Sequence, residues 1–181
     1  MEMNQLLTLV AASITYILAA VCYFRYRQKQ FPTLAVWGTA FLIYAFLSTG
    51  ELLWESIPRY LDGLAAGLTL GLLLSGSILI YSKRPELHIV SAIVAFAILM
   101  SMTFSVRALI ALSIFTPIVL MFIIFGIGFY KTRNRLIGLM IIGLIFLTIA
   151  GELHRGFPML YRFVDACGYL VMLLALSGIL K

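Results

Sequence analysis

Residues 46–58, FLSTGELLWESIP, decide the fold because they interrupt an apolar chain first with charge and then with proline. The apolar residues end one helical span, and Glu51 and Glu55 mark its polar end. Pro58 suits the first turn of a following helix, where its missing N–H costs little. Residues 146–158, FLTIAGELHRGFP, repeat the same order of features. The chain therefore contains two charged hairpins between apolar helices.

The composition indicates a protein of the cell membrane. The chain has 181 residues, 63% of them hydrophobic and only 11% charged, and its mean hydropathy is +1.09. One soluble domain of this length could not bury so much apolar surface. Polar backbone groups in lipid must bond within their own segment, and no alternating barrel pattern is present, so we expect an all-α polytopic membrane protein.

Seven apolar segments are long enough to cross a bilayer, which takes roughly 20 helical residues. We expect helices near residues 5–25, 32–53, 59–82, 87–105, 108–130, 135–153 and 159–180. The segment from 87 to 130 is divided at FSVRAL, because one unbroken helix would be about 66 Å long and the hydrocarbon core is only about 30 Å thick. The first segment lacks a basic region and a cleavage pattern, so we expect a retained span and not a signal peptide.

Positive charge predicts the orientation, because basic residues near span ends are held on the cytoplasmic side. Nine of the 13 basic residues fall at one set of span ends and four at the other, which places the amino terminus outside and the carboxyl terminus in the cytoplasm. Topology thus explains the net charge of +6 without a nucleic-acid partner. The cytoplasmic group is Arg25, Arg27, Lys29, Lys83, Arg84, Lys131, Arg133, Arg135 and Lys181, and the outer group is Arg59, Arg107, Arg155 and Arg162.

The two hairpins belong to a longer internal similarity. Each is followed by a helix that ends in a Ser-Gly-containing stretch, LLLSGSIL or LLALSGIL, and each half begins with a span that closes on YFRYR or FYKTR. These matches predict one domain with repeat 1 near residues 5–82, a linker helix near 87–105 and repeat 2 near 108–181. Because the linker crosses once, the repeats are parallel.

This plan of three helices, one linker and three helices resembles that of the SWEET sugar transporters and their PQ-loop relatives. The resemblance covers the whole chain, but only as topology. The Pro-Gln dipeptide of that superfamily does not occur in this sequence, so no residue role is transferred from it. Function has to be argued from the residues of this chain.

Charged residues gather in the two outer hairpins, which hold five of the seven acidic residues. A carboxylate at the end of an apolar span is costly to desolvate, so each should face a polar cleft or bind a cation. The alternative is that the hairpins are charged only because they are exposed to water at the membrane surface. The residues that we assign to a solute or ion pathway are Glu51, Glu55, Arg59, Asp62, Glu152, His154, Arg162 and Asp165.

Glu51 and Glu152 are the central pair of this hypothesis, because they lie in matching Gly-Glu-Leu triplets one repeat apart. We expect both carboxylates to face the interior and to bind a proton or another cation. Asp62 and Asp165 are a second candidate pair. Arg59, Arg155 and Arg162 are alternative partners for the acids.

A small-residue seam follows the first hairpin. Gly63, Gly67, Gly71 and Ser75 recur every fourth residue in GLAAGLTLGLLLSG and therefore share one helix face. Small residues at this spacing allow two helix backbones to approach closely. The seam predicts helix packing and says little about chemistry.

Aromatic residues near the span ends have two interpretations. They could line a pathway, or they could form the belt that aromatic side chains make at membrane surfaces. The residues concerned are Tyr16, Trp37, Tyr44, Trp54, Tyr60 and Tyr161.

We expect no cofactor and no metal site. The two cysteines and two histidines, Cys22, Cys167, His88 and His154, do not have the spacing of a metal site, and the cysteines lie toward opposite membrane faces. The last span has no lysine before the terminal Lys181, which excludes a retinal Schiff base of the rhodopsin kind.

The leading functional hypothesis is a transporter or channel for a small solute or ion, because it uses the duplication, the short loops and the symmetric acids together. Two alternatives stay open. The chain could be a non-catalytic sensor, scaffold or subunit that binds a second copy or another membrane protein. It could also be a membrane enzyme acting on a lipid or isoprenoid, with Glu51, Glu152 and His154 in acid-base roles.

Overall fold

The computed structural model describes residues 3–54, 59–80, 89–103, 107–153 and 156–177. Within these ranges the ordered elements are seven α-helices, so the predicted all-helical fold is confirmed. The helices are α1 (Met3–Lys29), α2 (Pro32–Leu53), α3 (Arg59–Leu79), α4 (Ile89–Thr103), α5 (Arg107–Thr132), α6 (Arg135–Leu153) and α7 (Pro158–Ser177).

Several of these helices suit a bilayer. Four of them are long and apolar enough to cross one: α1, α2, α5 over Leu112–Thr132, and α7 over Met159–Ser177. Within the described residues, the apolar parts of the other three are shorter, namely Gly63–Leu79 in α3, Ala92–Ser101 in α4 and Arg135–Gly151 in α6. The lengths and composition of the four longer helices agree with a membrane location.

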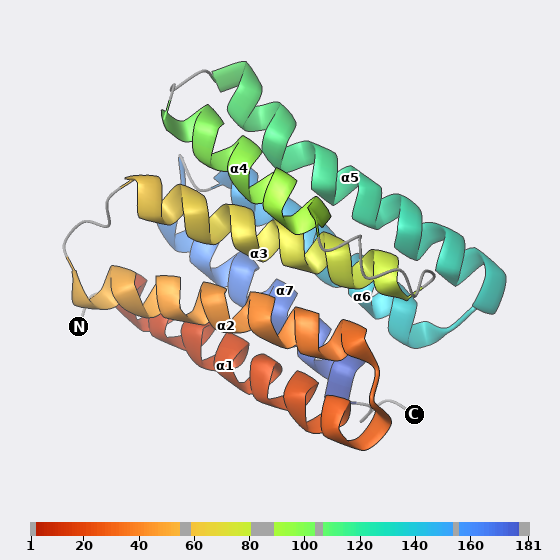
Figure 1. Ribbon diagram of the computed structural model, residues 1–181. Helices are drawn as coiled ribbons and strands as arrows, with labels where there is room; N and C mark the ends of the chain where they lie inside the picture. The colour runs from red at the N-terminus through yellow and green to blue at the C-terminus, as the bar shows by residue number, and fades with distance from the viewer. Residues whose placement is uncertain (1–2, 55–58, 81–88, 104–106, 154–155, 178–181) are drawn as a thin grey trace.

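The helices form a ring in which each one packs on the next along the chain and α7 closes on α1 (Figure 1). Helix α3 also contacts α5 directly, and α4 packs against both of them. The start of α1 and the end of α7 are at opposite ends of the bundle. Helices α2 and α7 differ from neighbouring pairs, because their backbones do not approach closely anywhere in the described residues.

The interior of the ring is filled by aromatic, methionine, leucine and alanine side chains. Trp37 of α2 is buried, donates its indole N–H to the Leu73 carbonyl of α3 at 3.1 Å, and lies with its ring centroid 5.9 Å from that of Phe125. Gly76 makes this contact possible, because a Cβ there would lie 2.4 Å from the indole ring. Trp37 is therefore a core residue, which corrects the expectation of a surface-belt position.

The turn after α1 and the turn after α5 have the same backbone geometry. Gln30 has a φ of 54° and Arg133 a φ of 51°, and each donates its N–H to the carbonyl four residues earlier at 2.7 Å. In both turns the next helix begins two residues later. This positive φ after the last helical residue is the usual left-handed C-terminal cap, although neither residue is a glycine.

Helix α1 continues to Lys29, four residues past the expected end at residue 25. The basic residues at this end remain helical because their side chains can interact with carbonyls at helix C-termini. Arg25 does so across the bundle, donating a hydrogen bond from its guanidinium group to the Ser177 carbonyl at the end of α7.

Glycines mark two close helix contacts. All four residues of the small-residue seam in α3 are buried, and a Cβ at Gly67 would lie 2.8 Å from the Ala95 Cα of α4. A second close approach joins Gly143 of α6 to Gly168 of α7, where a Cβ on either residue would lie within 3.2 Å of the other's carbonyl oxygen. The sequence pattern indicated the first contact but not the second.

Candidate functional site

One face of α2 carries the aromatic and polar side chains that point into the ring. Phe41, Tyr44, Ser48 and Glu51 follow one another at spacings of three or four residues, which places them on one side of a helix. Phe41 and Ser48 are fully buried. These four residues thus form a line along α2 from the aromatic core to a carboxylate at the end of the helix.

The facing surface of α7 follows the same rule. Tyr161, Asp165 and Tyr169 are four residues apart, so they share one helix face, and Arg162 lies beside them. Asp165 is only 4% exposed and Arg162 only 7% exposed. A buried carboxylate and a buried guanidinium group therefore occur within one turn of a single apolar helix.

Arg162 connects α7 to α2 through an ion pair. Its guanidinium group donates a hydrogen bond to the Glu51 carboxylate, and the Glu51 side chain remains 28% exposed. The same guanidinium group donates to the Tyr161 hydroxyl at 3.2 Å, and its central carbon lies 4.7 Å from the Tyr161 ring centroid. Arg162 is thus held by a charge, a hydroxyl and an aromatic face.

A second connection lies deeper in the bundle. The Tyr44 hydroxyl of α2 donates a hydrogen bond to the Asp165 carboxylate of α7. The Tyr44 and Tyr169 rings have centroids 4.9 Å apart, and Phe41 meets Tyr169 edge to face at 6.1 Å. We call the six residues Tyr44, Glu51, Tyr161, Arg162, Asp165 and Tyr169 the α2–α7 charged cluster.

The α2–α7 charged cluster has an unequal charge count. Its described side chains include two carboxylates, Glu51 and Asp165, but one guanidinium group, Arg162. When both acids are ionised, the cluster carries one net negative charge in an apolar bundle, which is unfavourable. A proton or another small cation would neutralise it.

The structure places three of the predicted pathway residues together, namely Glu51, Arg162 and Asp165. Among the three arginines considered as partners for the acids, Arg162 is the one paired with Glu51. The pairing of Glu51 with Glu152 stays a prediction, because the Glu152 side chain lies outside the described residues. The side chains of Arg59 and Asp62, and residues Glu55, His154 and Arg155 altogether, also lie outside them.

Three members of the cluster were not assigned to the pathway set from the sequence. Tyr44 and Tyr161 were interpreted only as pathway or belt aromatics, and Tyr169 was not singled out. The available signal was spacing, since Tyr44 lies seven residues before Glu51 and Tyr169 lies four residues after Asp165. Residues separated by four or seven share a helix face.

Metal and disulfide chemistry find no support in the described residues. No three His, Cys, Asp or Glu side chains gather there closely enough to hold a metal ion. Both cysteines are free, and Cys22 is buried in α1. The contacts that the described site residues make are a charge pair and hydrogen bonds.

Replacing Tyr44 by Phe should destabilise the protein by about 1–3 kcal/mol, because the buried Asp165 carboxylate would lose a hydrogen-bond donor. Thermal unfolding in detergent would measure the change. Tyr23→Phe is the matched control, since the Tyr23 hydroxyl pairs with Thr39 at 2.8 Å on an exposed surface. Equal stability changes in the two variants would show that the Tyr44 hydrogen bond contributes no more to stability than the exposed Tyr23 hydrogen bond.

Comparison with known proteins assigns no function, so the function has to be argued from this geometry. No protein-family model matches the chain, and searches of curated proteins and of solved structures find no similar protein that would indicate its family or function.

Proposed function

We propose that this protein is a seven-helix membrane transporter or channel for a small solute or ion, and that the α2–α7 charged cluster performs its charge-dependent step. The observation that carries the proposal is the buried Asp165 carboxylate, which accepts a hydrogen bond from Tyr44 and lies within one helical turn of Arg162, the ion-pair partner of Glu51. Ionisable residues within membrane helices are costly, and they usually mark ion or substrate pathways. Structural stability alone is a poor reason for such a group, since apolar packing often serves as well.

The buried carboxylate favours a positively charged species at this site. A proton or a small cation would stabilise the Asp165 side chain, whereas an anion beside it would be repelled. Partial exposure of Glu51 gives access from the end of the bundle where α2 ends and α7 begins. In the orientation expected from the basic residues, this end faces the outside of the cell.

Aromatic side chains close the bundle beyond the cluster. Phe41, Tyr44 and Tyr169 contact one another directly below Asp165, and Trp37 packs on Phe125 further in. These rings would therefore have to move before a species at Asp165 could pass further into the bundle. Such a movement is plausible between α2 and α7 because side chains, and not close backbone packing, connect these two helices.

The proposed internal repeat gains support from two independent features. Exchanging α1, α2 and α3 for α5, α6 and α7 maps three helix contacts onto three others, namely α1–α2 onto α5–α6, α2–α3 onto α6–α7, and α1–α7 onto α5–α3, while the contacts of α4 with α3 and α5 have no counterpart. The turns that follow α1 and α5 also have matching positive φ values and hydrogen bonds. Parallel repeats around a central site are a common plan among transporters.

Proteoliposomes containing the purified protein provide the test. We expect flux of at least one small cation or solute above that of empty liposomes, and a loss of about tenfold or more in Asp165→Asn, which keeps the size of the side chain but removes its charge. Arg133→Met, a change at an exposed arginine over Tyr130, should leave flux unchanged. Glu152→Gln belongs in the same assay, because the repeat predicts a role equivalent to that of Glu51.

Flux in Asp165→Asn equal to wild type would remove the cluster from the transport step. No flux across a broad panel of ions and solutes would contradict the transporter proposal and favour a sensor or a subunit of a larger membrane complex.

A further inference from the structure

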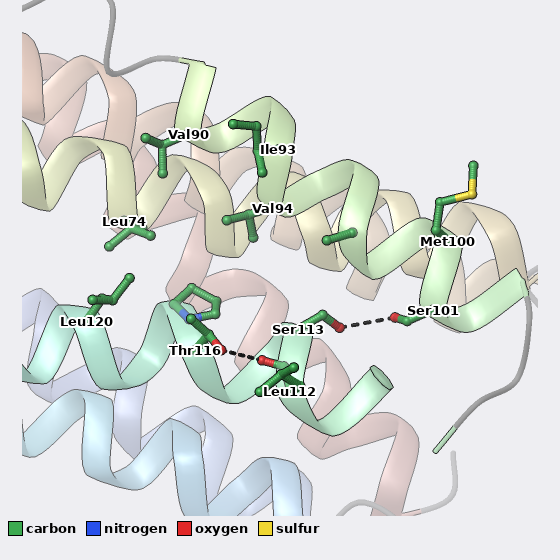
Figure 2. A pocket seen from close by; sticks show the side chains of 12 residues that line it. Leu74, Val90, Ile93, Val94, Met100, Ser101, Leu112, Ser113, Thr116 and Leu120 are labelled. Carbon is green, nitrogen blue, oxygen red and sulfur yellow. Dashed lines mark hydrogen bonds between the residues drawn. The ribbon is translucent and has the colours of Figure 1, made fainter. Parts of the chain in front are cut away.

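An elongated pocket of about 560 Å³ lies between α3, α4 and α5, apart from the α2–α7 charged cluster (Figure 2). Leu74 of α3 forms part of its wall, and the remaining lining comes from α4 and α5. Along α4 the lining runs from Val90 to Ser101, which corresponds to about 16 Å of helix. The volume is typical of sites that bind small molecules.

The pocket has an apolar body and a hydroxyl-bearing end. Val90, Val94 and Leu120 line the body with hydrocarbon. Near the other end, the Ser101 hydroxyl of α4 and the Ser113 hydroxyl of α5 point toward one another with their oxygens 3.1 Å apart (Figure 2). None of the lining residues is charged. This polarity gradient matches a molecule with a hydrocarbon tail and an uncharged polar head.

The open side of the pocket is also apolar. Ile93 of α4 is 61% exposed and Leu112 of α5 is 65% exposed, and both belong to the lining. Large apolar side chains at a rim favour entry from a hydrocarbon phase over entry from water. In a membrane protein, a ligand would therefore enter sideways from the bilayer.

The uncharged lining argues against a charged occupant. A charged lipid headgroup is a poor fit, because burying a charge without a partner is costly and no lining residue is charged. A single hydrocarbon chain with a hydroxyl head satisfies this constraint.

We propose that this pocket binds an uncharged single-chain amphiphile of the long-chain or isoprenoid alcohol class, with its tail between α4 and α5 and its hydroxyl at Ser101 and Ser113. The ligand hydroxyl donates to the serine pair, because Ser101 already donates its proton to the Ile98 carbonyl at 2.9 Å, and the tail covers the exposed apolar rim. The inference rests on the proposed membrane location but is independent of transport.

A photoreactive long-chain alcohol, used with the full-length protein in lipid nanodiscs, tests the proposal. We expect crosslinks in α4 and α5, and competition by an unlabelled long-chain alcohol. Ala97→Phe, which fills the pocket from an exposed lining position, should lower labelling about tenfold. Ala92→Phe is the matched control, since Ala92 is an exposed alanine of the same helix outside the lining.

Ser101→Ala keeps the pocket open and tests the polar end. Wild type should prefer the alcohol probe over the corresponding photoreactive alkane by about fivefold, and Ser101→Ala should lose this preference. Equal labelling of the Ala97 and Ala92 variants, or crosslinks spread evenly over all apolar helix surfaces, would show ordinary boundary lipid only and overturn the proposal. Crosslinking of α4 to a second copy of the chain by a bifunctional reagent would overturn it in favour of an assembly contact.

Asp165→Asn separates this proposal from the transport proposal. It should label as strongly as wild type, because Asp165 does not line the pocket. Loss of labelling in Ala97→Phe, together with loss of the alcohol preference in Ser101→Ala, would support the lipid site even if no flux were found.

Discussion

Replacing Arg162 by Met should lower the free energy of unfolding by about 3–5 kcal/mol. Arg162 is buried, and it is the only described cation paired with Glu51 in the α2–α7 charged cluster. Its removal would take the guanidinium charge away from beside Glu51 and the buried Asp165, while the methionine retains most of the apolar stem. In a protein of this size the loss corresponds to a fall in melting temperature of roughly 10 °C or more.

Arg133→Met is the control for this measurement, because Arg133 also lies over a tyrosine ring, at 5.6 Å from the Tyr130 centroid, but on an exposed turn. It should change the stability by less than about 1 kcal/mol. Adding Glu51→Gln to Arg162→Met should restore part of the stability, since it removes the negative charge that Arg162 pairs with in the wild type. Equal melting temperatures for Arg162→Met and Arg133→Met would contradict a buried charge pair between α2 and α7.

Replacing Gly67 by Leu should disrupt the packing of α4 on α3. A Cβ at Gly67 would already lie 2.8 Å from the Ala95 Cα and 3.0 Å from the Ala95 carbonyl oxygen, so a main chain and not a flexible side chain would have to move. Overpacking of this kind typically costs about 1–3 kcal/mol and can cost more where the backbone must shift. We expect a lower melting temperature, aggregation, or increased protease cleavage near α4.

Gly126→Leu in α5 is the matched control, because nothing lies within 4 Å of a Cβ at Gly126. Leucine is also a better helix former than glycine, so this variant should be neutral or more stable. Unchanged stability of Gly67→Leu, measured beside Gly126→Leu, would show that α3 and α4 separate freely at this seam.

The helices could be predicted from the sequence because each one is a long apolar run bounded by charge, proline or glycine. Helix α2 was expected at residues 32–53 and is found at Pro32–Leu53. The end of α1 was less certain, because Arg25, Arg27 and Lys29 are polar residues that nevertheless continue the helix. Hydropathy reports where lipid could begin, and not where helical hydrogen bonding stops.

Helix neighbours were harder to predict, because apolar patterns in a membrane protein do not say which helices touch. The close approach of Gly143 to Gly168 joins two helices without a regular small-residue seam, so the sequence pattern did not predict this contact. The pocket lined by Ser101 and Ser113 depends on how α4 sits against α5, which sequence spacing within either helix does not specify.

The candidate site was predictable in its parts but not in its pairing. Costly carboxylates at apolar helix ends singled out Glu51 and Asp165, and Arg162 was among the possible cations. The repeat directed attention to an acid pair with Glu152, whereas the described contact of Glu51 is with Arg162. Which arginine reaches an acid depends on helix rotation, and Tyr44 joins the cluster for the same reason.

The central claim is that Glu51 and Asp165 act with Arg162 as one charge-dependent unit, and a double-variant flux experiment tests it most directly. Flux of the transported species should be measured in proteoliposomes with equal amounts of folded wild type, Glu51→Gln, Asp165→Asn and the double variant. We predict that each single variant loses about tenfold or more, and that the double variant is no worse than the weaker single variant, because groups that act together are not additive. Full flux in both single variants, or losses that multiply in the double variant, would contradict the account.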